Sequence, residues 1–226
     1  MLHNFLVLAL IAAATITIVG LYARLWRKLR WRAREFDEIT RQREQLLMQV
    51  KQRAQDIEQL KQQSIADELT GLKTRSYFME ALRTEWERAS RGGVSFAVLM
   101  VELDGLEQVA ATFGQPESER VLARAGRLLQ EKSRHSNVVA RYGEDRFVVL
   151  LPDADLEPAK ISADRLRVWM ENDPVLKDSC ITGSFGVAAH PVHGTTEEEL
   201  LRAAEAGILA AKAHGGNCVE TPEVRS

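Results

Sequence analysis

The chain has 226 residues, with 30 basic and 32 acidic side chains, a formal net charge of −2 and 45% hydrophobic residues. This is enough for the core of one ordinary domain with additional segments. Six of the basic residues lie at 24–34 without an acid, which leaves 24 basic against 32 acidic residues over 35–226. The acidic balance excludes DNA or RNA as a general partner. Cys180 and Cys218 have no metal-binding spacing and fit a reducing compartment.

Residues 5–23 carry no charge and consist mainly of Leu, Ile, Val and Ala. A helix of about 20 apolar residues spans the hydrocarbon core of a bilayer. We therefore predict that residues 1–34 form a membrane anchor with a basic juxtamembrane segment. A cleaved signal peptide is the alternative, but it would carry its cations before the apolar stretch, and here they follow it. The cation excess after the span places the rest of the chain in the cytoplasm.

Residues 35–65 form the next segment, which over 36–64 is Gln-rich and free of Gly and Pro. Apolar residues occupy six of nine positions on a heptad seam in this segment. The pattern predicts a coiled-coil linker and a parallel homodimer. Arg43 and Arg53 interrupt the seam, so we expect a marginal dimer, and a single solvated helix is the alternative.

From residue 66 to residue 222, short helices and strands alternate. The predicted helices are 75–90, 105–113, 117–134, one capped by Asp155 with Pro158 in its first turn, and 195–214. The predicted strands are 95–102, 138–140, 147–151, 180–189 and a short one at 218–219. This order predicts an α+β domain with helices covering a mixed sheet.

Several segments of this domain match the motifs of one family in chain order. They are Asp67-Glu68-Leu69-Thr70-Gly71-Leu72, Val101-Glu102-Leu103-Asp104, Arg141-Tyr142-Gly143 and the turn that it begins, Ser184-Phe185-Gly186-Val187, and Ala211-Lys212-Ala213-His214-Gly215-Gly216-Asn217. Residues 66–222 thereby resemble the GGDEF domain of bacterial diguanylate cyclases. The resemblance implies a fold like the palm domain of nucleotidyl cyclases. It also implies an activity that joins two GTP molecules into cyclic di-GMP, and a location at the bacterial inner membrane.

The attack of a hydroxyl on a phosphate in this family needs divalent metal, which is held by converging carboxylates. The resemblance assigns these carboxylates to Glu102 and Asp145. The alternative is that both are ordinary acids at strand ends. We expect no cofactor, or Mg²⁺ if a nucleotide still binds.

The signature turn reads Gly143-Glu144-Asp145-Arg146-Phe147, where the family has Gly-Gly-Asp-Glu-Phe. Glu144 adds bulk and negative charge where the triphosphate should approach the backbone. Arg146 reverses the charge beside the reacting hydroxyl. The resemblance therefore implies a degenerate signature in which we expect no catalytic residue.

Other nucleotide-binding positions of the family have also changed. Ala110 replaces an Asn that recognises guanine, Glu119 replaces an Asp with the same role, and Glu107 and Gly216 replace phosphate-binding cations. Glu119 and Lys212 remain candidates for nucleotide contacts. Each lost hydrogen bond costs about 1–3 kcal/mol, so four or five changes remove about 5–10 kcal/mol, or about 10⁴-fold in rate.

The family's inhibitory product site is Arg-x-x-Asp, and here it reads Arg134-His135-Ser136-Asn137. Arg134 is the candidate contact for cyclic di-GMP. Three functions stay open. The first is a non-catalytic, membrane-anchored protein that acts through a protein partner in cyclic di-GMP signalling or in an envelope assembly. The second is a receptor for cyclic di-GMP or GTP, and the third is a weak diguanylate cyclase.

Overall fold

The computed structural model describes residues 20–22, 24, 26–28, 43–53 and 65–222, and the chain divides into two compact units, Met1–Lys61 and Gln62–Ser226. In the first unit, residues 43–53 are helical and exposed. Most of the predicted span at 5–23 and of the predicted linker at 35–65 lies outside the described residues. Among the helices that are described, none has the length and apolar character needed to cross a bilayer.

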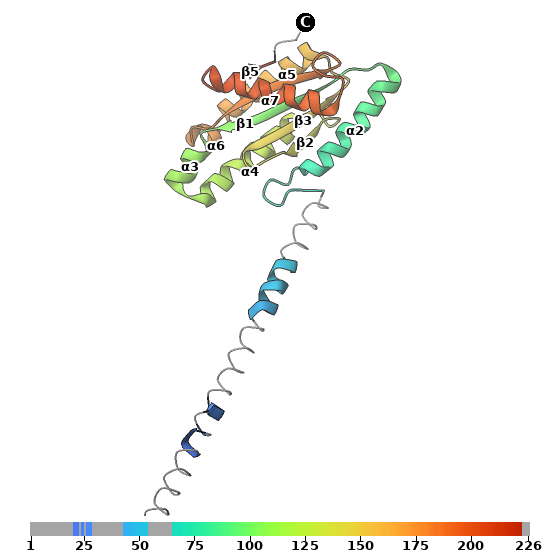
Figure 1. The fold of residues 1–226 in the computed structure, drawn as a ribbon. Helices are drawn as coiled ribbons and strands as arrows, with labels where there is room; N and C mark the ends of the chain where they lie inside the picture. Colours follow the sequence, from blue (N-terminus) through green and yellow to red (C-terminus); the bar gives the residue numbers. More distant parts are fainter. Residues whose placement is uncertain (1–19, 23, 25, 29–42, 54–64, 223–226) are drawn as a thin grey trace, which may run out of the picture. The chain divides into compact units, whose positions relative to one another are not determined.

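The second unit is built on a mixed five-stranded sheet with the strand order β2-β3-β1-β4-β5 (Figure 1). The strands are β1 (Phe96–Asp104), β2 (Val138–Arg141), β3 (Arg146–Pro152), β4 (Thr182–His190) and β5 (Val219–Glu220). Neighbouring strands are antiparallel except for the parallel pair of β4 and β5. The predicted α+β arrangement with a mixed sheet is confirmed.

The helices are α2 (Arg75–Gly92), α3 (Leu106–Phe113), α4 (Gln115–Lys132), α5 (Leu156–Asn172), α6 (Pro174–Asp178) and α7 (Glu197–Ala213). The sequence prediction lacked α6, because a helix of five residues is too short to show periodicity. Its start is nonetheless well capped, since Asp173 accepts hydrogen bonds from the backbone of Val175 and Leu176. Asp155 precedes α5 as predicted but makes no side-chain cap, and its carboxylate accepts a hydrogen bond from Ser95 instead.

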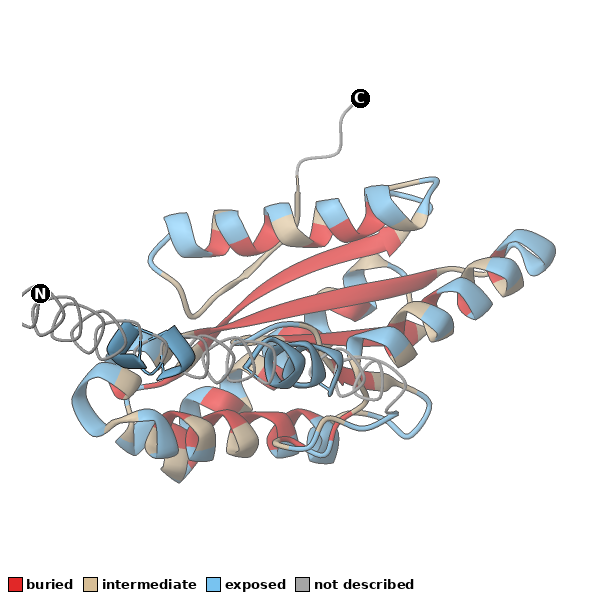
Figure 2. Ribbon diagram, turned by 60° about the horizontal axis from the view of Figure 1, so that its bottom comes forward, coloured by how far each residue is buried: buried red, intermediate tan, exposed pale blue. Residues whose placement is uncertain are grey.

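Helices cover both faces of the sheet, so its central strands are buried on both sides. The helices α3, α4, α5 and α6 contribute to one core, and α2 and α7 contribute to the other. Along β1, Leu99 and Val101 enter the first core while Val98 and Met100 enter the second, as the two-residue period of a strand requires. Figure 2 shows the strands buried along most of their length and the helices buried on the sides that face the sheet.

The register of the central strands sets the position of the signature turn. Glu102 on β1 lies directly opposite Arg146 on β3. The hairpin of β2 and β3 therefore brings its turn to the end of β1 where Glu102 lies.

Candidate functional site

The signature turn is held by backbone hydrogen bonds on two sides. Within the hairpin, the amides of Tyr142 and Gly143 donate to the carbonyl oxygen of Arg146, at 2.8 and 3.2 Å. Across to β1, the amide of Leu103 donates to the carbonyl oxygen of Asp145 at 3.1 Å. The turn is therefore fixed to the strand end that carries Glu102.

Glu102 accepts hydrogen bonds from two cations, one on each carboxylate oxygen. Arg146 Nε donates to Oε2 at 2.6 Å, and Lys212 Nζ from the last turn of α7 donates to Oε1. Glu102 is only 6% exposed, whereas the side chains of Arg146 and Lys212 are 40% and 39% exposed. Burial raises the pKa of Glu102, but Lys212 and Arg146 lower it by more, so the pKa of this carboxyl lies below its usual range. The carboxylate is therefore ionised and fully paired.

A cavity of about 580 Å³ lies beside the turn. It is lined by Leu69, Leu106, Glu107, Ala110, Gln115, Ser118, Glu119, Leu122, Arg141, Glu144 and Asp145. The structure thus brings together both guanine positions, Ala110 and Glu119, with Glu107 and Glu144, whereas the phosphate positions Lys212 and Gly216 do not line this cavity. It places Glu102, Arg146 and Lys212 together as a separate group that does not line the cavity.

The cavity is strongly acidic, with four carboxylates and Arg141 as the one cation among its described lining residues. Arg141 is already engaged, because it donates to the Asp67 carboxylate at 3.2 Å and to the carbonyl oxygens of Gly143 and Glu144 at 3.1 Å. Glu119 accepts only from the neutral amide of Gln115, at 3.0 Å. Within residues 65–222, no ion pair involves any of the four acids. The cavity therefore repels a triphosphate.

The residues assigned to a divalent metal do not fit one. Both oxygens of Glu102 are bonded to Arg146 and Lys212, which leaves Asp145 as the remaining candidate. Magnesium requires several oxygen ligands in an octahedral arrangement. Over the described part of the chain, no group of three or more His, Cys, Asp or Glu side chains is placed to hold a metal ion.

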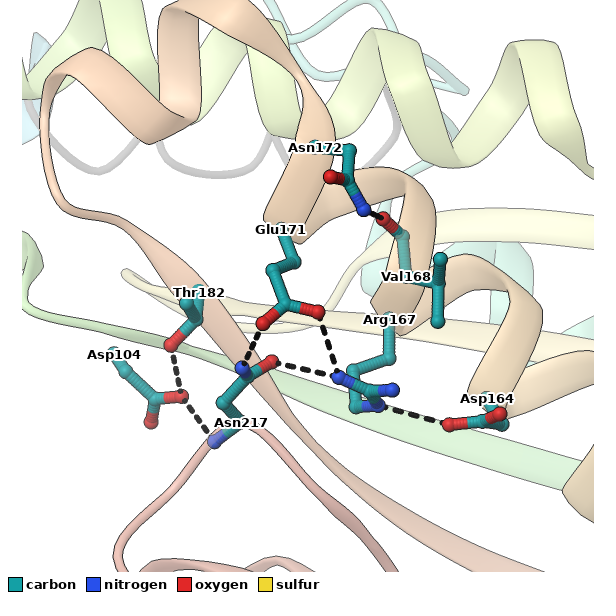
Figure 3. Close-up of polar contacts among 8 residues, drawn as sticks. All are labelled: Asp104, Asp164, Arg167, Val168, Glu171, Asn172, Thr182 and Asn217. Atoms are coloured by element: carbon teal, nitrogen blue, oxygen red, sulfur yellow. Dashed lines mark hydrogen bonds and ion pairs between the residues drawn. The ribbon is translucent and has the colours of Figure 1, made fainter.

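Asp104, the second acid of the strand motif, has a different task from Glu102. Its carboxylate accepts from the Thr182 hydroxyl at 2.9 Å and from the Asn217 amide at 3.1 Å (Figure 3), and from the Ser184 hydroxyl at 2.8 Å. The side chain of Asn217 also donates to Glu171 at 2.9 Å. These bonds tie the loop after α7 to the sheet and to α5, and so fix the end of the helix that carries Lys212.

Gly216 lies in this loop, where the family carries a phosphate-binding Arg. Its backbone has a φ of +78°, and an added Cβ would lie 3.1 Å from the Asp104 carboxylate. A side chain at this position requires a strained backbone and a shift of Asp104.

A second and smaller cavity, of about 40 Å³, lies at the other end of α4 and is basic. Arg134 and Asn137 of the predicted product site both line it, together with Arg165 and Trp169. Two cations lie over the Trp169 ring. The Arg165 guanidinium is 5.0 Å from the centre of the ring, and Lys132 Nζ is 5.3 Å from the same centre. We call Lys132, Arg134, Arg165 and Trp169 the basic cluster.

Sequence reasoning found Arg134 but not the other members of the basic cluster. Arg165 and Trp169 are one helical turn apart on α5, a spacing that predicts a cation beside an aromatic ring. That they meet Arg134 depends on the packing of α5 beside the end of α4, which no local pattern reveals.

The sequence pattern described as "Diguanylate cyclase, GGDEF domain" matches residues 64–218. The response regulator PleD of Caulobacter vibrioides is 33% identical over 161 residues, which cover 69% of this chain and 36% of PleD. This chain therefore spans only about a third of the length of that relative.

Two solved structures extend the likeness to the fold. The diguanylate cyclase SiaD of Pseudomonas aeruginosa, in complex with its activator SiaC, is 27% identical with a TM-score of 0.63, covering 96% of this chain and 85% of that one. A microbial GGDEF domain, studied for its interaction with cyclic di-GMP, is 26% identical with a TM-score of 0.61, covering 71% of this chain and 98% of that one.

Proposed function

The chain belongs to the GGDEF family of diguanylate cyclases, and from this membership we propose that it serves cyclic di-GMP signalling without cyclase activity of its own. It acts, in this proposal, by presenting its GGDEF domain to a protein partner. The segment at 1–34 anchors it in the bacterial inner membrane, and the segment at 35–65 pairs two copies on the cytoplasmic side.

The pairing of Glu102 carries the proposal. A cyclase of this family uses this strand-end acid for metal, and here Arg146 and Lys212 hold both of its oxygens. Arg146 stands at the signature position where the family has an acid. One substitution thus removes a carboxylate from the site and neutralises another.

The acidic cavity supports the same conclusion. Glu107 and Glu144 line it where the family has a cation and a glycine, and Ala110 offers no hydrogen bond to a base. Two like charges about 4 Å apart near a protein surface repel by about 4 kcal/mol at an effective dielectric constant of about 20. A triphosphate that meets several unpaired carboxylates therefore loses more binding free energy than its hydrogen bonds can restore.

A protein partner is supported by the intact fold around this altered site. The domain keeps its capped helices and two full cores although the cavity has lost its nucleotide contacts. The similar SiaD was solved in complex with a protein activator. We extend this mode of action to the present chain.

The first test is an assay of the purified full chain with GTP and either Mg²⁺ or Mn²⁺, with the product followed by chromatography. We expect no cyclic di-GMP above the level of a Glu102→Gln control. Product that forms with the natural chain and is lost in this control would overturn the proposal.

A second test separates protein contacts from nucleotide chemistry in cells. Ala110→Trp fills the cavity from α3 without touching the outer surfaces of α2 or α7. We expect this variant to complement a deletion strain as well as the natural chain does. Failure of a stably folded Ala110→Trp chain would indicate that the cavity itself is used.

The basic cluster favours a second candidate, a receptor for cyclic di-GMP. Arg134 and Arg165 offer two guanidinium groups, which suit phosphate in a bidentate geometry, and the Trp169 ring lies against Arg165. Calorimetry with cyclic di-GMP tests this candidate. Saturable heat that disappears in an Arg134→Ala, Arg165→Ala variant supports it, and its absence in the natural chain rejects it.

A further inference from the structure

The group formed by Arg146, Glu102 and Lys212, which we call the ion triad, lies at the metal position of the family. We propose that the two cations of the triad replace the divalent metal: they hold the signature turn on β1 without it and exclude it from Glu102. This inference extends the proposed absence of cyclase activity, and its biological meaning rests on that proposal. Its test, however, requires no nucleotide.

The triad joins three elements through one carboxylate. Arg146 begins β3 and lies opposite Glu102 in the antiparallel register of β1 and β3. Lys212 comes from the last turn of α7 and pairs with the other oxygen of Glu102. Because Glu102 is buried and each oxygen has its own cation, the carboxylate needs no metal to be satisfied.

The charges of the triad also oppose a divalent cation. One carboxylate between two cations leaves a net charge of +1, and both cations reach the solvent. An incoming Mg²⁺ or Mn²⁺ must displace at least one of them from Glu102. The displaced cation then remains close by and repels the metal, at a distance where screening by salt is weak.

Asp145 does not compensate for the loss of Glu102. Its carbonyl oxygen accepts a hydrogen bond from the amide of Leu103 on β1, and the residue is part of the lining of the acidic cavity. A single free carboxylate is a poor site for a divalent cation, which takes its selectivity from several oxygen ligands.

The triad has a consequence for the proposed mode of action. The signature turn stays on β1 whether or not metal or nucleotide is present, because its ties are all internal. A partner that binds this end of the domain therefore meets the same surface at all times, and its binding does not depend on the cellular supply of GTP.

The experiment compares metal binding and thermal unfolding of the full chain with those of an Arg146→Glu variant. Free Mn²⁺ is measured by electron paramagnetic resonance, and unfolding is followed with either Mn²⁺ or EDTA present. For the natural chain, we expect no bound Mn²⁺ and midpoints that agree within about 1 °C. For Arg146→Glu, we expect a lower midpoint in EDTA, by about 3–8 °C, and recovery of part of this shift with Mn²⁺.

Arg120→Glu is the matched control, because it makes the same charge change on the exposed surface of α4, where Arg120 pairs with Glu117. We expect no response to Mn²⁺ from this variant. If Arg146→Glu does not fold, Arg146→Gln replaces it, with the same expected direction and a smaller gain from Mn²⁺.

Two results overturn the inference. The first is Mn²⁺ binding by the natural chain that is lost in Glu102→Gln. The second is a folded Arg146→Glu or Arg146→Gln variant that gains no Mn²⁺ binding, since another feature would then exclude the metal. A third result separates this inference from the proposed function. If the natural chain binds no Mn²⁺ in the absence of nucleotide but produces cyclic di-GMP, the proposed function is overturned and the inference about the triad is retained.

Discussion

The two ends of α4 carry opposite charge. At its N-terminal end, Gln115, Ser118 and Glu119 line the acidic cavity, where Arg141, the one cation among the lining residues that the structure describes, is already bonded. Just past its C-terminal end, Arg134 lines a cavity that also contains Arg165 and is bordered by Trp169. In the family, both places accept phosphorylated nucleotides, the substrate at the first and the product at the second. Here only the second keeps the charge that a phosphate requires.

The contrast shows which parts of such a domain can change independently. A helix N-terminus has partial positive charge, which favours phosphate, but four carboxylates around the cavity at the start of α4 outweigh it. The core that underlies both ends is unaffected, because charged groups at the rim contribute little to the burial of Val121 or Leu129. The acidic rim therefore costs the fold little, while its charge opposes the approach of a triphosphate.

The largest effect is expected when the acidic end is converted back to the family's residues. A chain with Glu107→Lys, Ala110→Asn, Glu144→Gly and Arg146→Glu should produce cyclic di-GMP at least about 100-fold above the natural chain, because hydrogen bonds are regained and two of the four cavity carboxylates are removed. Chromatography of the product measures this. The control adds Glu102→Gln, which should remove the gain. An inert restored chain would show that the charges of the cavity are not what prevents catalysis.

Removal of the central carboxylate should destabilise the fold. Glu102→Ala removes the shared partner of Arg146 and Lys212, and we expect a loss of about 2 kcal/mol in the free energy of unfolding, less than for a fully buried pair because both cations keep solvent contact. Urea unfolding measures it. Glu117→Ala, which removes an exposed pair with Arg120, should cost less than about 0.5 kcal/mol. Equal losses in the two variants would contradict a structural role for the triad.

The basic end can be weakened one residue at a time. Arg165→Ala should reduce the affinity for cyclic di-GMP about 10-fold, the usual loss of one charge-assisted hydrogen bond. Calorimetry measures the change against Arg127→Ala, which removes an exposed cation of α4 outside the cluster. If both variants lose the same affinity, general charge attraction rather than the cluster is responsible.

The smallest effect is a dependence of stability on pH. For Asp67, burial raises the pKa, but hydrogen bonds from Thr70 and the nearby Arg141 lower it by more, and the net pKa of Glu102 is lowered in the same way by Lys212 and Arg146. The unfolded chain then binds more protons in acid, so the stabilisation is present at neutral pH and is lost as the pH falls below about 5. Thermal unfolding from pH 7 to about pH 2.5 should show this decline, most of it below about pH 4.5, with a shallower slope in Glu102→Gln. A slope that Glu102→Gln leaves unchanged would show that other carboxylates are responsible.

Much of the fold could be predicted from the sequence because hydrophobic periodicity reports directly on burial. The strand predicted at 95–102 and the helix predicted at 75–90 follow from apolar runs, and the structure has them at Phe96–Asp104 and Arg75–Gly92. The short helix α6 was missed because five residues are too few to show periodicity, although Asp173 and Pro174 mark its start. The second bond of Asp173, from Arg124 at 2.6 Å and 49 positions away, leaves no local signal.

The sequence predicted which residues line the candidate site but not which partners their side chains have. Glu107, Ala110 and Glu144 were assigned to one nucleotide site by motif, and they do line one cavity. The partners of Glu102 were not predicted, because they depend on the register of β1 with β3 and on where the last turn of α7 ends. Glu102 was considered as a metal ligand or as an ordinary acid, and the structure shows it instead as the centre of two ion pairs.

A titration with nucleotide decides whether this domain still binds the substrate of its family. The full chain is titrated by calorimetry with a GTP analogue that cannot react, in the presence of Mg²⁺. We predict no saturable heat up to about 1 mM analogue, a concentration at which even a site worth about 4 kcal/mol would be half filled. A micromolar dissociation constant that rises in Glu102→Gln would contradict the claim that the acidic cavity and the ion triad prevent this domain from binding GTP.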